Sequence, residues 1–316
     1  MAAPTTPIPD PAVGKPPRPK RWIPISLRMF VAILVLVGLG SALWIGVPAY
    51  RQFVAIREIE RVGGSYRSVP TGPMWLRQWL GDSRMRMFDH VYSVDLTGAE
   101  ATDTTLRQIS NLQYVFDLDV SGTMVTDAGF RHLGKMTSLR ELRVINPQIT
   151  DAGLAQLSGL KNLMLLDLSE TQTTGDGLKS LKGLPKLEAL LLGGTGIHPA
   201  DLVNLGRVQR VTQLDLSDNR ITDGDMVNLK GFTGLQSLDL SNSKVTDAGL
   251  EQLRGLANLS YLALLDTQVT KAGAIKLKRA LPELTIDRHG TTYKPGTSER
   301  GDPFGVLRPS PRHGGE

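Results

Sequence analysis

The feature that most constrains this chain is a 24-residue period that repeats eight times without an insertion or a deletion. When each unit is set to start on an apolar residue, its fourth, sixth and nineteenth positions are apolar as well. The first positions are Val91, Val115, Leu139, Leu163, Leu187, Val211, Leu235 and Leu259. A unit of roughly 20–50 residues that recurs in phase is typical of a solenoid, whose units stack to bury one continuous core. The period therefore predicts a repeat domain over residues 91–287.

The unit that begins at Leu235 shows how the first half of a repeat is expected to fold. Leu238 and Leu240 alternate with polar residues, and this period of two predicts a short strand with one buried face. Ser243 follows the strand, where a short polar side chain can bond the turning backbone between neighbouring units. The final segment of the domain, residues 281–287, has only room for such a strand and predicts a truncated ninth unit.

The second half of the same unit predicts a helix. Thr246 and Asp247 offer side-chain oxygens that can cap the free N–H groups of a helix starting near Ala248. Leu250 and Leu253 then share one inward face at helical spacing. We expect the strands to form a parallel sheet on the concave side of the solenoid and the helices to cover its convex side.

These residues fit the pattern L-x-x-L-x-L-x-x-[TSN]-x-[VI]-T-D-x-G-L, which resembles the leucine-rich repeat with a helical convex side. The chain is similar to bacterial membrane-anchored leucine-rich repeat proteins and, more distantly, to the repeats of F-box substrate receptors. The resemblance implies an α/β horseshoe solenoid and a binding role, but a fold of this kind does not identify its ligand. Some units depart from the pattern, with Gly175, Pro199 and Lys271 in place of Asp, and with Pro147 after Asn146.

The N-terminal 50 residues do not follow the repeat. Residues 1–28 are rich in proline and contain a basic cluster, which predicts a disordered tail. Met29 to Tyr50 carry no charge, and this run is long enough for a transmembrane helix of about 20 residues. We interpret it as an uncleaved signal anchor rather than a cleaved signal peptide, since no clear A-x-A site follows. The basic cluster favours a cytoplasmic N-terminus and an extracytoplasmic repeat domain.

Residues 51–90 are expected to link the anchor to the repeats and to cap them. The apolar spacing predicts a helix over 49–62 that ends at two glycines, and a second helix over 74–80. We interpret Trp75 and Trp79 as covering the open edge of the first strand, with a partner-binding patch as the alternative. At the other end of the chain, the Gly- and Pro-containing residues 288–316 predict a disordered tail.

The distribution of charge disfavours a nucleic-acid partner. The chain has a net charge of +5, yet residues 91–282 contain 19 basic and 21 acidic side chains. The basic excess lies in residues 1–90, with 12 basic and 5 acidic side chains, whereas a nucleic-acid-binding domain needs a basic stripe on its folded surface. Cysteine is absent, so the chain has no thiolate for a disulfide or a metal site.

The concave sheet is the candidate partner-binding surface, because the third, fifth and seventh positions of each unit point outward from it. Five carboxylates share the fifth column; they either solvate this face or form an acidic groove for a basic or polar partner. Arg143 is expected to supply counter-charge, and Leu191 beside Leu165 to form an apolar hot spot. The candidate residues are Asp95, Asp119, Glu141, Arg143, Leu165, Asp167, Leu191, Asp215, Asp239 and Tyr261.

The sequence contains no pattern that predicts an enzyme, a cofactor or a metal. Its five histidines are scattered, and neither a nucleophile elbow nor a phosphate-binding glycine loop occurs. His198 lies near Asp201, but a solvated turn is the preferred interpretation. We therefore expect a non-enzymatic protein-binding module with a protein or peptide ligand. The alternatives are an envelope scaffold that acts by self-association and a substrate-recognition subunit similar to F-box receptors.

Overall fold

The computed structural model describes Met29, Ala32, Val35, Leu36 and residues 46–205 and 210–288. The chain divides into two compact units, Met1–Gly46 and Val47–Glu316. The predicted anchor over Met29 to Tyr50 lies for the most part outside the described residues, as do both predicted tails apart from Arg288. Among the helices of the described part, none is both long enough and apolar enough to cross a membrane.

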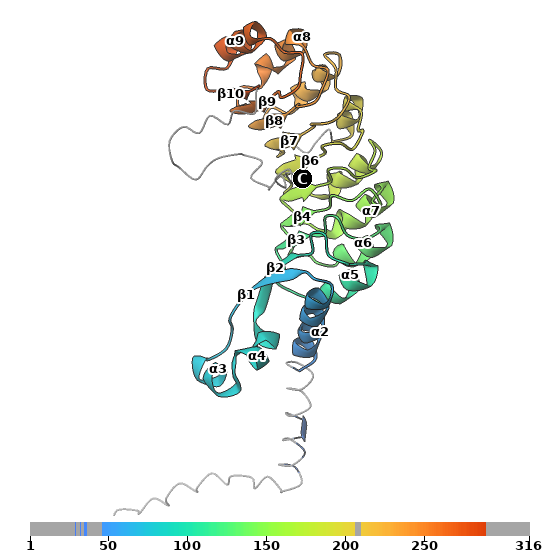
Figure 1. Cartoon of the computed structure of the whole chain (residues 1–316), viewed down its shortest axis with the longest axis vertical. Helices are drawn as coiled ribbons and strands as arrows, with labels where there is room; N and C mark the ends of the chain where they lie inside the picture. The colour runs from blue at the N-terminus through green and yellow to red at the C-terminus, as the bar shows by residue number, and fades with distance from the viewer. Residues whose placement is uncertain (1–28, 30–31, 33–34, 37–45, 206–209, 289–316) are drawn as a thin grey trace, which may run out of the picture. The chain divides into compact units, whose positions relative to one another are not determined.

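The second unit is built on one ten-stranded sheet whose strands follow one another in sequence order (Figure 1). From β2 onward all neighbours are parallel, and each strand is offset by 24 residues from the one before, as in the pairing of Val94 with Leu118. This constant offset confirms the 24-residue unit. The parallel strands are β2 His90–Asp95, β3 Asp117–Asp119, β4 Glu141–Arg143, β5 Leu165–Asp167, β6 Ala189–Leu191, β7 Gln213–Asp215, β8 Ser237–Asp239, β9 Tyr261–Ala263 and β10 Thr285–Asp287.

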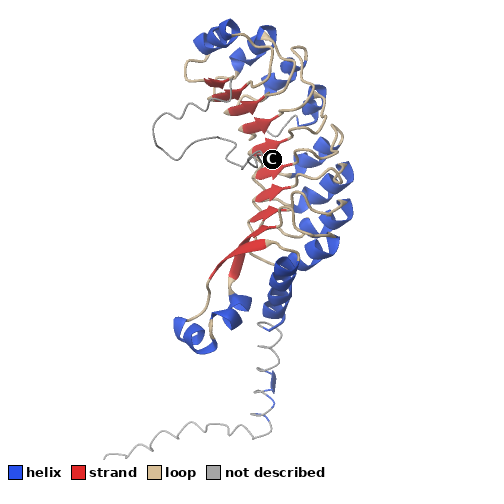
Figure 2. Cartoon of the chain, in the orientation of Figure 1, coloured by secondary structure: helices blue, strands red, loops and turns tan. Residues whose placement is uncertain are grey.

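The helices lie on the opposite, convex side of the solenoid (Figure 2), and their type changes along the chain. The first three and the last two units contain α-helices, whereas the fourth to sixth contain only 3₁₀-helices. The α-helices are α5 Asp103–Ile109, α6 Asp127–Leu133, α7 Asp151–Ala155, α8 Asp247–Leu250 and α9 Lys271–Ala280. The 3₁₀-helices are η3 Gln156–Gly159, η4 Gly177–Gly183, η5 Pro199–Leu205, η6 Asp225–Gly231 and η7 Glu251–Gly255.

The apolar columns of the repeat form one continuous core between the sheet and the convex helices. Leu118, Leu142 and Leu166 occupy the fourth position of successive units and are completely buried. Leu250 and Leu253 are buried from the helical side, as their spacing predicts. Burial of a leucine side chain stabilises a fold by about 1.5–3 kcal/mol relative to exposure. The stacked columns therefore supply the main stabilisation of the domain.

The polar ninth position of the unit stabilises the turn after the strand in some units only. Asn219 donates from Nδ2 to the carbonyl oxygens of Leu192 and Leu216, at 2.8 and 3.2 Å, and so connects two units. Ser243 was expected to do the same, and this prediction is wrong, because its buried Oγ has no hydrogen-bond partner. The serine hydroxyl is shorter than the asparagine amide and does not reach the neighbouring unit.

The two residues of the repeat's Thr-Asp pair bond different units: the threonine bonds its own unit and the aspartate bonds the next. Thr246 caps its own helix by accepting a hydrogen bond from the N–H of Ala248 at 3.2 Å. Asp247 was expected to cap the same helix; instead, its carboxylate accepts from the backbone N–H and the hydroxyl of Thr270 in the next unit, at 2.7 and 2.6 Å. The same bridge joins Asp103 to Thr126, Asp127 to Thr150, Asp151 to Thr174 and Asp223 to Thr246.

The first unit is capped by α2 (Val47–Arg61) and β1 (Ser65–Val69). β1 pairs antiparallel with β2 and satisfies the edge of the sheet, although no strand was predicted there. Ile59 of α2 is fully buried in the core. The short helices α3 Met74–Leu80, α4 Asp82–Met85 and η2 Arg86–Phe88 follow. The prediction that Trp75 and Trp79 cover the first strand is wrong: both are exposed, since β1 already occupies that edge.

Candidate binding surface

The parallel sheet places the predicted site residues in lateral rows across neighbouring strands. The pairing aligns Ser93 with Asp117 in the third column and Asp95 with Asp119 in the fifth. The same register continues to Tyr261 and Ala263 on β9. All ten candidate residues therefore belong to strands of one sheet, and a partner would meet a surface whose backbone is fixed by hydrogen bonds.

The five aspartates of the fifth column share a structural task that the sequence analysis did not foresee. In each case Oδ1 accepts a hydrogen bond from the backbone N–H two residues further on. In Asp95 the donor is Thr97, at 2.9 Å, and in Asp119 it is Ser121, also at 2.9 Å. Asp167, Asp215 and Asp239 make the equivalent bonds at 2.8–2.9 Å to Ser169, Ser217 and Ser241.

This bond is an Asx turn, a motif in which an aspartate or asparagine oxygen takes the place of a backbone acceptor. It ends the strand and starts the turn towards the convex side. The column of aspartates is thus explained in part by local backbone chemistry. The one trace of it in the sequence is the position of each aspartate at the predicted end of a strand, where an Asx turn is favoured.

The aspartates differ in their exposure to solvent. Asp95 is exposed and Asp119 and Asp215 are partly buried, whereas Asp167 retains 2% and Asp239 retains 5% of its accessible surface. Burial raises the pKa of Asp167, and this outweighs its hydrogen bonds from Ser169 and the attraction of Arg143. The acidic column is therefore not a uniform stripe of solvated charge.

Arg143 provides the counter-charge expected on this face, but its direct partners are in the third column. Its guanidinium contacts the carboxylate of Asp117 at 2.7 Å and that of Glu141 at 2.8 Å. Asp117 was missing from the predicted site residues, although it lies beside Glu141 in the register. The guanidinium side chain is 17% exposed, so this three-residue cluster is a well-ordered polar feature of the concave surface.

The apolar hot spot predicted around Leu191 is more buried than its sequence pattern predicts. Leu191 and Ala189 on β6 each retain 6% of their accessible surface. Leu165 on β5 and Tyr261 on β9 are partly buried. Near the middle of the sheet, Leu165 is therefore the apolar side chain with surface left for a partner, whereas Leu191 offers little.

The described residues hold no metal-binding cluster, and His198 does not pair with Asp201. No group of three or more His, Asp or Glu side chains in this part of the chain is arranged to hold a metal ion. His198 is 69% exposed at its side chain, and its Nδ1 accepts from the N–H of Ala200 at 3.4 Å. Its nearest described carboxylate is that of Asp225, at 3.9 Å, and not that of Asp201.

The repeats are similar to a known family of sequences and to solved structures. The model of a family described as leucine rich repeat matches residues 209–269. No protein of curated function matches the chain. Among solved structures, an internalin C2 from Listeria monocytogenes is 22% identical, with 62% of this chain and 80% of the internalin covered and a TM-score of 0.48. An internalin F from the same organism is 21% identical, with 62% and 60% covered and a TM-score of 0.45.

Proposed function

This chain is a leucine-rich repeat protein, and on that premise we propose that it is a non-enzymatic module that binds a protein or peptide on its concave sheet. The observation that carries the proposal is the fixed lateral register of the third and fifth columns across β2 to β9. A surface that is ordered before binding loses little conformational entropy when a partner docks. The sheet offers such a surface over eight successive strands.

The chemistry of the face favours a partner with basic or polar groups. Among the third- and fifth-position side chains of β2 to β9, the one cation is Arg143. The acidic side chains outnumber it: they are Asp117, Glu141 and the fifth-column aspartates. Complementary charge steers association and selects among partners more than it sets the affinity. We propose that the acidic rows select the ligand and that Leu165 and Tyr261 contribute apolar contact area.

We further propose that the uncharged run from Met29 to Tyr50 anchors the protein in a membrane. Its length, the lack of charge and the preceding basic cluster support this assignment. In this arrangement the N-terminus is cytoplasmic and the repeat domain lies outside the cytoplasm. The repeats would then be displayed to partners in the cell envelope or beyond it.

The test uses the full-length chain, purified in detergent and used to capture partners from the envelope fraction of its own cells. In the test variant, Asp119, Asp167, Asp215 and Asp239 are changed to Asn. Asn preserves the acceptor that each Asx turn requires, so the variant removes charge without removing the turn. The control variant removes the same charge from exposed carboxylates outside the strands, with Glu100→Gln, Asp176→Asn, Asp266→Asn and Glu283→Gln.

A partner retained by the native chain and the control, but lost from the test variant, supports recognition by the concave acidic rows. Equal capture by all three proteins contradicts it. If the chain captures only itself, and sedimentation shows concentration-dependent association, the scaffold alternative takes its place.

A further inference from the structure

The helix α3 presents its aromatic side chains to solvent although it is held firmly in the fold. Trp75 is 66% exposed and Trp79 is 78% exposed, with Met74 next to them at 70%. Trp75 and Trp79 are four residues apart, so they lie on the same face of the helix. α3 has no buried residue. Large apolar side chains exposed together in this way mark a surface that meets an apolar or amphipathic partner.

Exposed apolar side chains are concentrated in this end of the domain. Among the described residues from Val47 onward, eight large exposed hydrophobic side chains lie within residues 47–90, against seven in all the repeats that follow. Tyr50 and Phe53 on α2 belong to the same group, at 66% and 40% exposure. The repeats bury their apolar side chains efficiently, so the exposure at this end is a local property.

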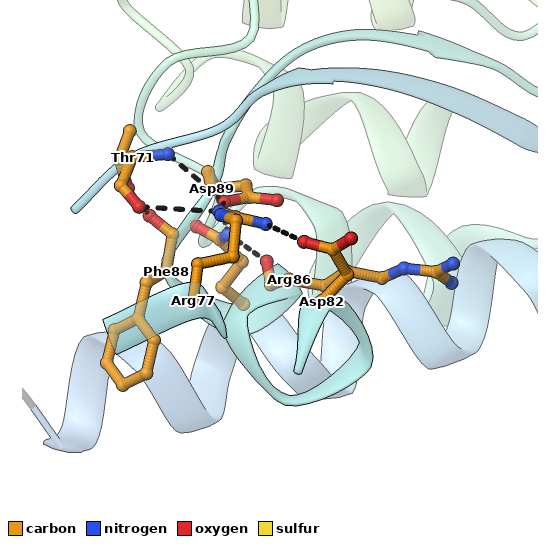
Figure 3. A network of polar contacts seen from close by, with 7 residues as sticks. Thr71, Arg77, Asp82, Arg86, Phe88 and Asp89 are labelled. Atoms are coloured by element: carbon orange, nitrogen blue, oxygen red, sulfur yellow. Dashed lines mark hydrogen bonds and ion pairs between the residues drawn. The ribbon is translucent and has the colours of Figure 1, made fainter. Parts of the chain in front are cut away.

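The other side of α3 is fastened by an ion-pair network (Figure 3). Arg77 contacts the carboxylates of Asp82, at 3.0 Å, and of Asp89, and its side chain is only 13% exposed. The N–H of Thr71 donates to Asp89 at 3.1 Å, and its hydroxyl donates to the carbonyl oxygen of Phe88. Arg77 lies between the two tryptophans in sequence and is directed inward. The fold therefore fixes α3 with its tryptophans facing out.

The same network is attached to the beginning of α2. Gln52 donates from Nε2 to the carbonyl oxygens of Arg86, at 3.2 Å, and of Asp89. Gln52 lies only two residues beyond Tyr50, where the uncharged run ends, which is about 3 Å of helix rise. α3 is thus tied to the first turns of the helix that continues the uncharged run, and not to the distant end of the repeats.

The charge of this region matches a lipid headgroup layer. Residues 47–90 contain seven arginines and four carboxylates, a net charge of +3, while the repeats that follow are slightly acidic. Arginine and tryptophan both combine an apolar body with a polar group, and both are favoured at the boundary between hydrocarbon and water. Basic groups near anionic lipid add further attraction.

We propose that α3 is an interfacial foot, which rests in the headgroup layer of the membrane with Trp75 and Trp79 inserted. The proposal rests on the membrane anchor of the proposed function. The foot would hold the first repeat at a set height above the lipid, because α3 is tied to Asp89, the residue directly before β2. Lipid, rather than a protein, is the favoured occupant because the exposed aromatics lie beside the segment that follows the uncharged run.

The test places the full-length chain in lipid nanodiscs of phosphatidylcholine and phosphatidylglycerol. The chain has four tryptophans, so Trp22→Phe with Trp44→Phe leaves Trp75 and Trp79 as the only indoles. Their fluorescence is compared in ordinary lipids and in lipids brominated near the headgroup end of the acyl chain. We expect an emission maximum shifted to the blue and roughly twofold quenching by bromine, because indole rings settle at the headgroup level.

The matched control replaces all four tryptophans by Phe and introduces Ile275→Trp, an exposed position on α9 at the other end of the repeats. This indole is expected to emit as in water and to escape quenching. Trp75 and Trp79 could emit and escape quenching as the control does, in a chain that resists alkaline carbonate extraction. That result would disprove the insertion of α3 in the headgroup layer and leave the membrane anchor in place. If carbonate releases the chain from the membrane, the anchor fails, and the foot that depends on it fails with it.

Discussion

Asp201 occupies the space that a side chain on Gly175 would need: its carboxyl carbon lies 2.1 Å from the position of a Cβ added to Gly175. At the junctions that have an Asp–Thr bridge the arrangement is the reverse: the earlier unit supplies the aspartate and the later unit supplies the glycine. Gly153, for example, leaves room for Asp127, whose Oδ1 would lie 2.5 Å from a Cβ at residue 153. The two residue types have changed places across the junction between the fourth and fifth units.

This exchange follows a rule that holds along the chain. Every unit that follows a bridging aspartate has glycine at the contact, namely Gly129, Gly153, Gly177, Gly249 and Gly273. At two junctions the earlier unit has no bridging aspartate. Where Gly175 stands in its place, the contact position of the next unit is Asp201, and where Pro199 stands in its place, that position is Asp225. Asp225 accepts from the N–H and the hydroxyl of Thr222 in its own unit, at 2.9 and 2.7 Å. It therefore gives Thr222 the acceptor that a bridging aspartate supplies elsewhere, but it does not join the two units.

The rule predicts that a regular junction can be converted to the exchanged form. Gly153→Asp alone sets two carboxylates against each other and overfills the contact, which we expect to cost about 2–4 kcal/mol of unfolding free energy. Asp127→Gly alone removes the bridge to Thr150, at about 1–3 kcal/mol. In the double variant the new aspartate bonds Thr150 as Asp225 bonds Thr222, so the loss is smaller than the sum of the two. Urea unfolding of the four proteins measures this coupling, and strictly additive losses would disprove the rule.

The bridge from Asp247 to Thr270 predicts a pH dependence of stability. Hydrogen bonds from the side chain and then the backbone of Thr270 lower the pKa of Asp247. A carboxyl with a lowered native pKa stabilises the fold at pH values above its ordinary range, and this contribution is lost as the pH falls through the native pKa. We therefore expect Asp247→Asn to be less stable than the native protein at neutral pH, by about 1 kcal/mol. The gap should close in acid; a gap independent of pH would contradict the assignment.

Much of this architecture is predictable from the sequence because a repeat presents the same evidence eight times. The core leucines, the strands and the 24-residue register follow from apolar spacing alone. The bonding partner of the Asp247 carboxylate could not be predicted in this way. The T-D pair has the pattern of a local helix cap, and the contact with the next unit depends on how the units stack. The strand β1 was missed for the same reason: its five residues alternate weakly and become a strand only by pairing with β2.

The candidate site was predictable in its position but not in its chemistry. Outward-pointing columns follow from the period of two, and all ten predicted residues lie on the sheet. The Asx turns require the backbone of the following residues to curve, which side-chain periodicity does not report. The burial of Leu191 likewise depends on neighbouring strands rather than on its own column.

The pKa of Asp167 is shifted in the opposite direction to that of Asp247, so its effect on stability should have the opposite pH dependence. Burial raises its pKa, so the native state holds a proton more readily than the unfolded state does. At neutral pH the charged carboxylate therefore weakens the fold, and the native protein gains stability as the pH falls from the raised pKa towards the ordinary value. We expect Asp167→Asn to raise the melting temperature at neutral pH, because Asn can still accept from Ser169.

The advantage of Asp167→Asn over the native protein should shrink as the pH is lowered. Asp95→Asn is the matched control, because Asp95 has the same turn bond and is exposed. A lower melting temperature for Asp167→Asn at neutral pH would show that the charge at this position is needed for stability.

Glu58 connects the N-terminal cap to the first repeat. Its side chain is 8% exposed, receives the Thr105 hydroxyl at 2.8 Å and pairs with Arg61 at 2.8 Å. Thr105 stands where later units have the contact glycine, so Glu58 takes the place of a bridging aspartate. Glu58→Ala leaves the buried Thr105 hydroxyl without its acceptor, which costs about 1–3 kcal/mol.

We expect this loss to be local to the cap. Hydrogen exchange of the α2 amides should quicken in Glu58→Ala while the amides of β6 remain protected. Glu58→Gln preserves the acceptor and serves as the control, with a smaller effect. Equal protection of α2 in Glu58→Ala and the native protein would show that the apolar contacts of Ile59 hold the cap unaided.

The run of 3₁₀-helices in the middle of the convex side has a mechanical consequence. The units before and after it are clamped to their neighbours by carboxylates, whereas Gly175 and Pro199 cannot clamp the units that follow them. Under tension, the units joined by carboxylate bridges should resist deformation. The junctions on either side of the fifth unit, which have no such bridge, should deform more easily. A force applied across the repeats would open the curvature at the fifth unit first, and the two halves of the concave face would then move separately.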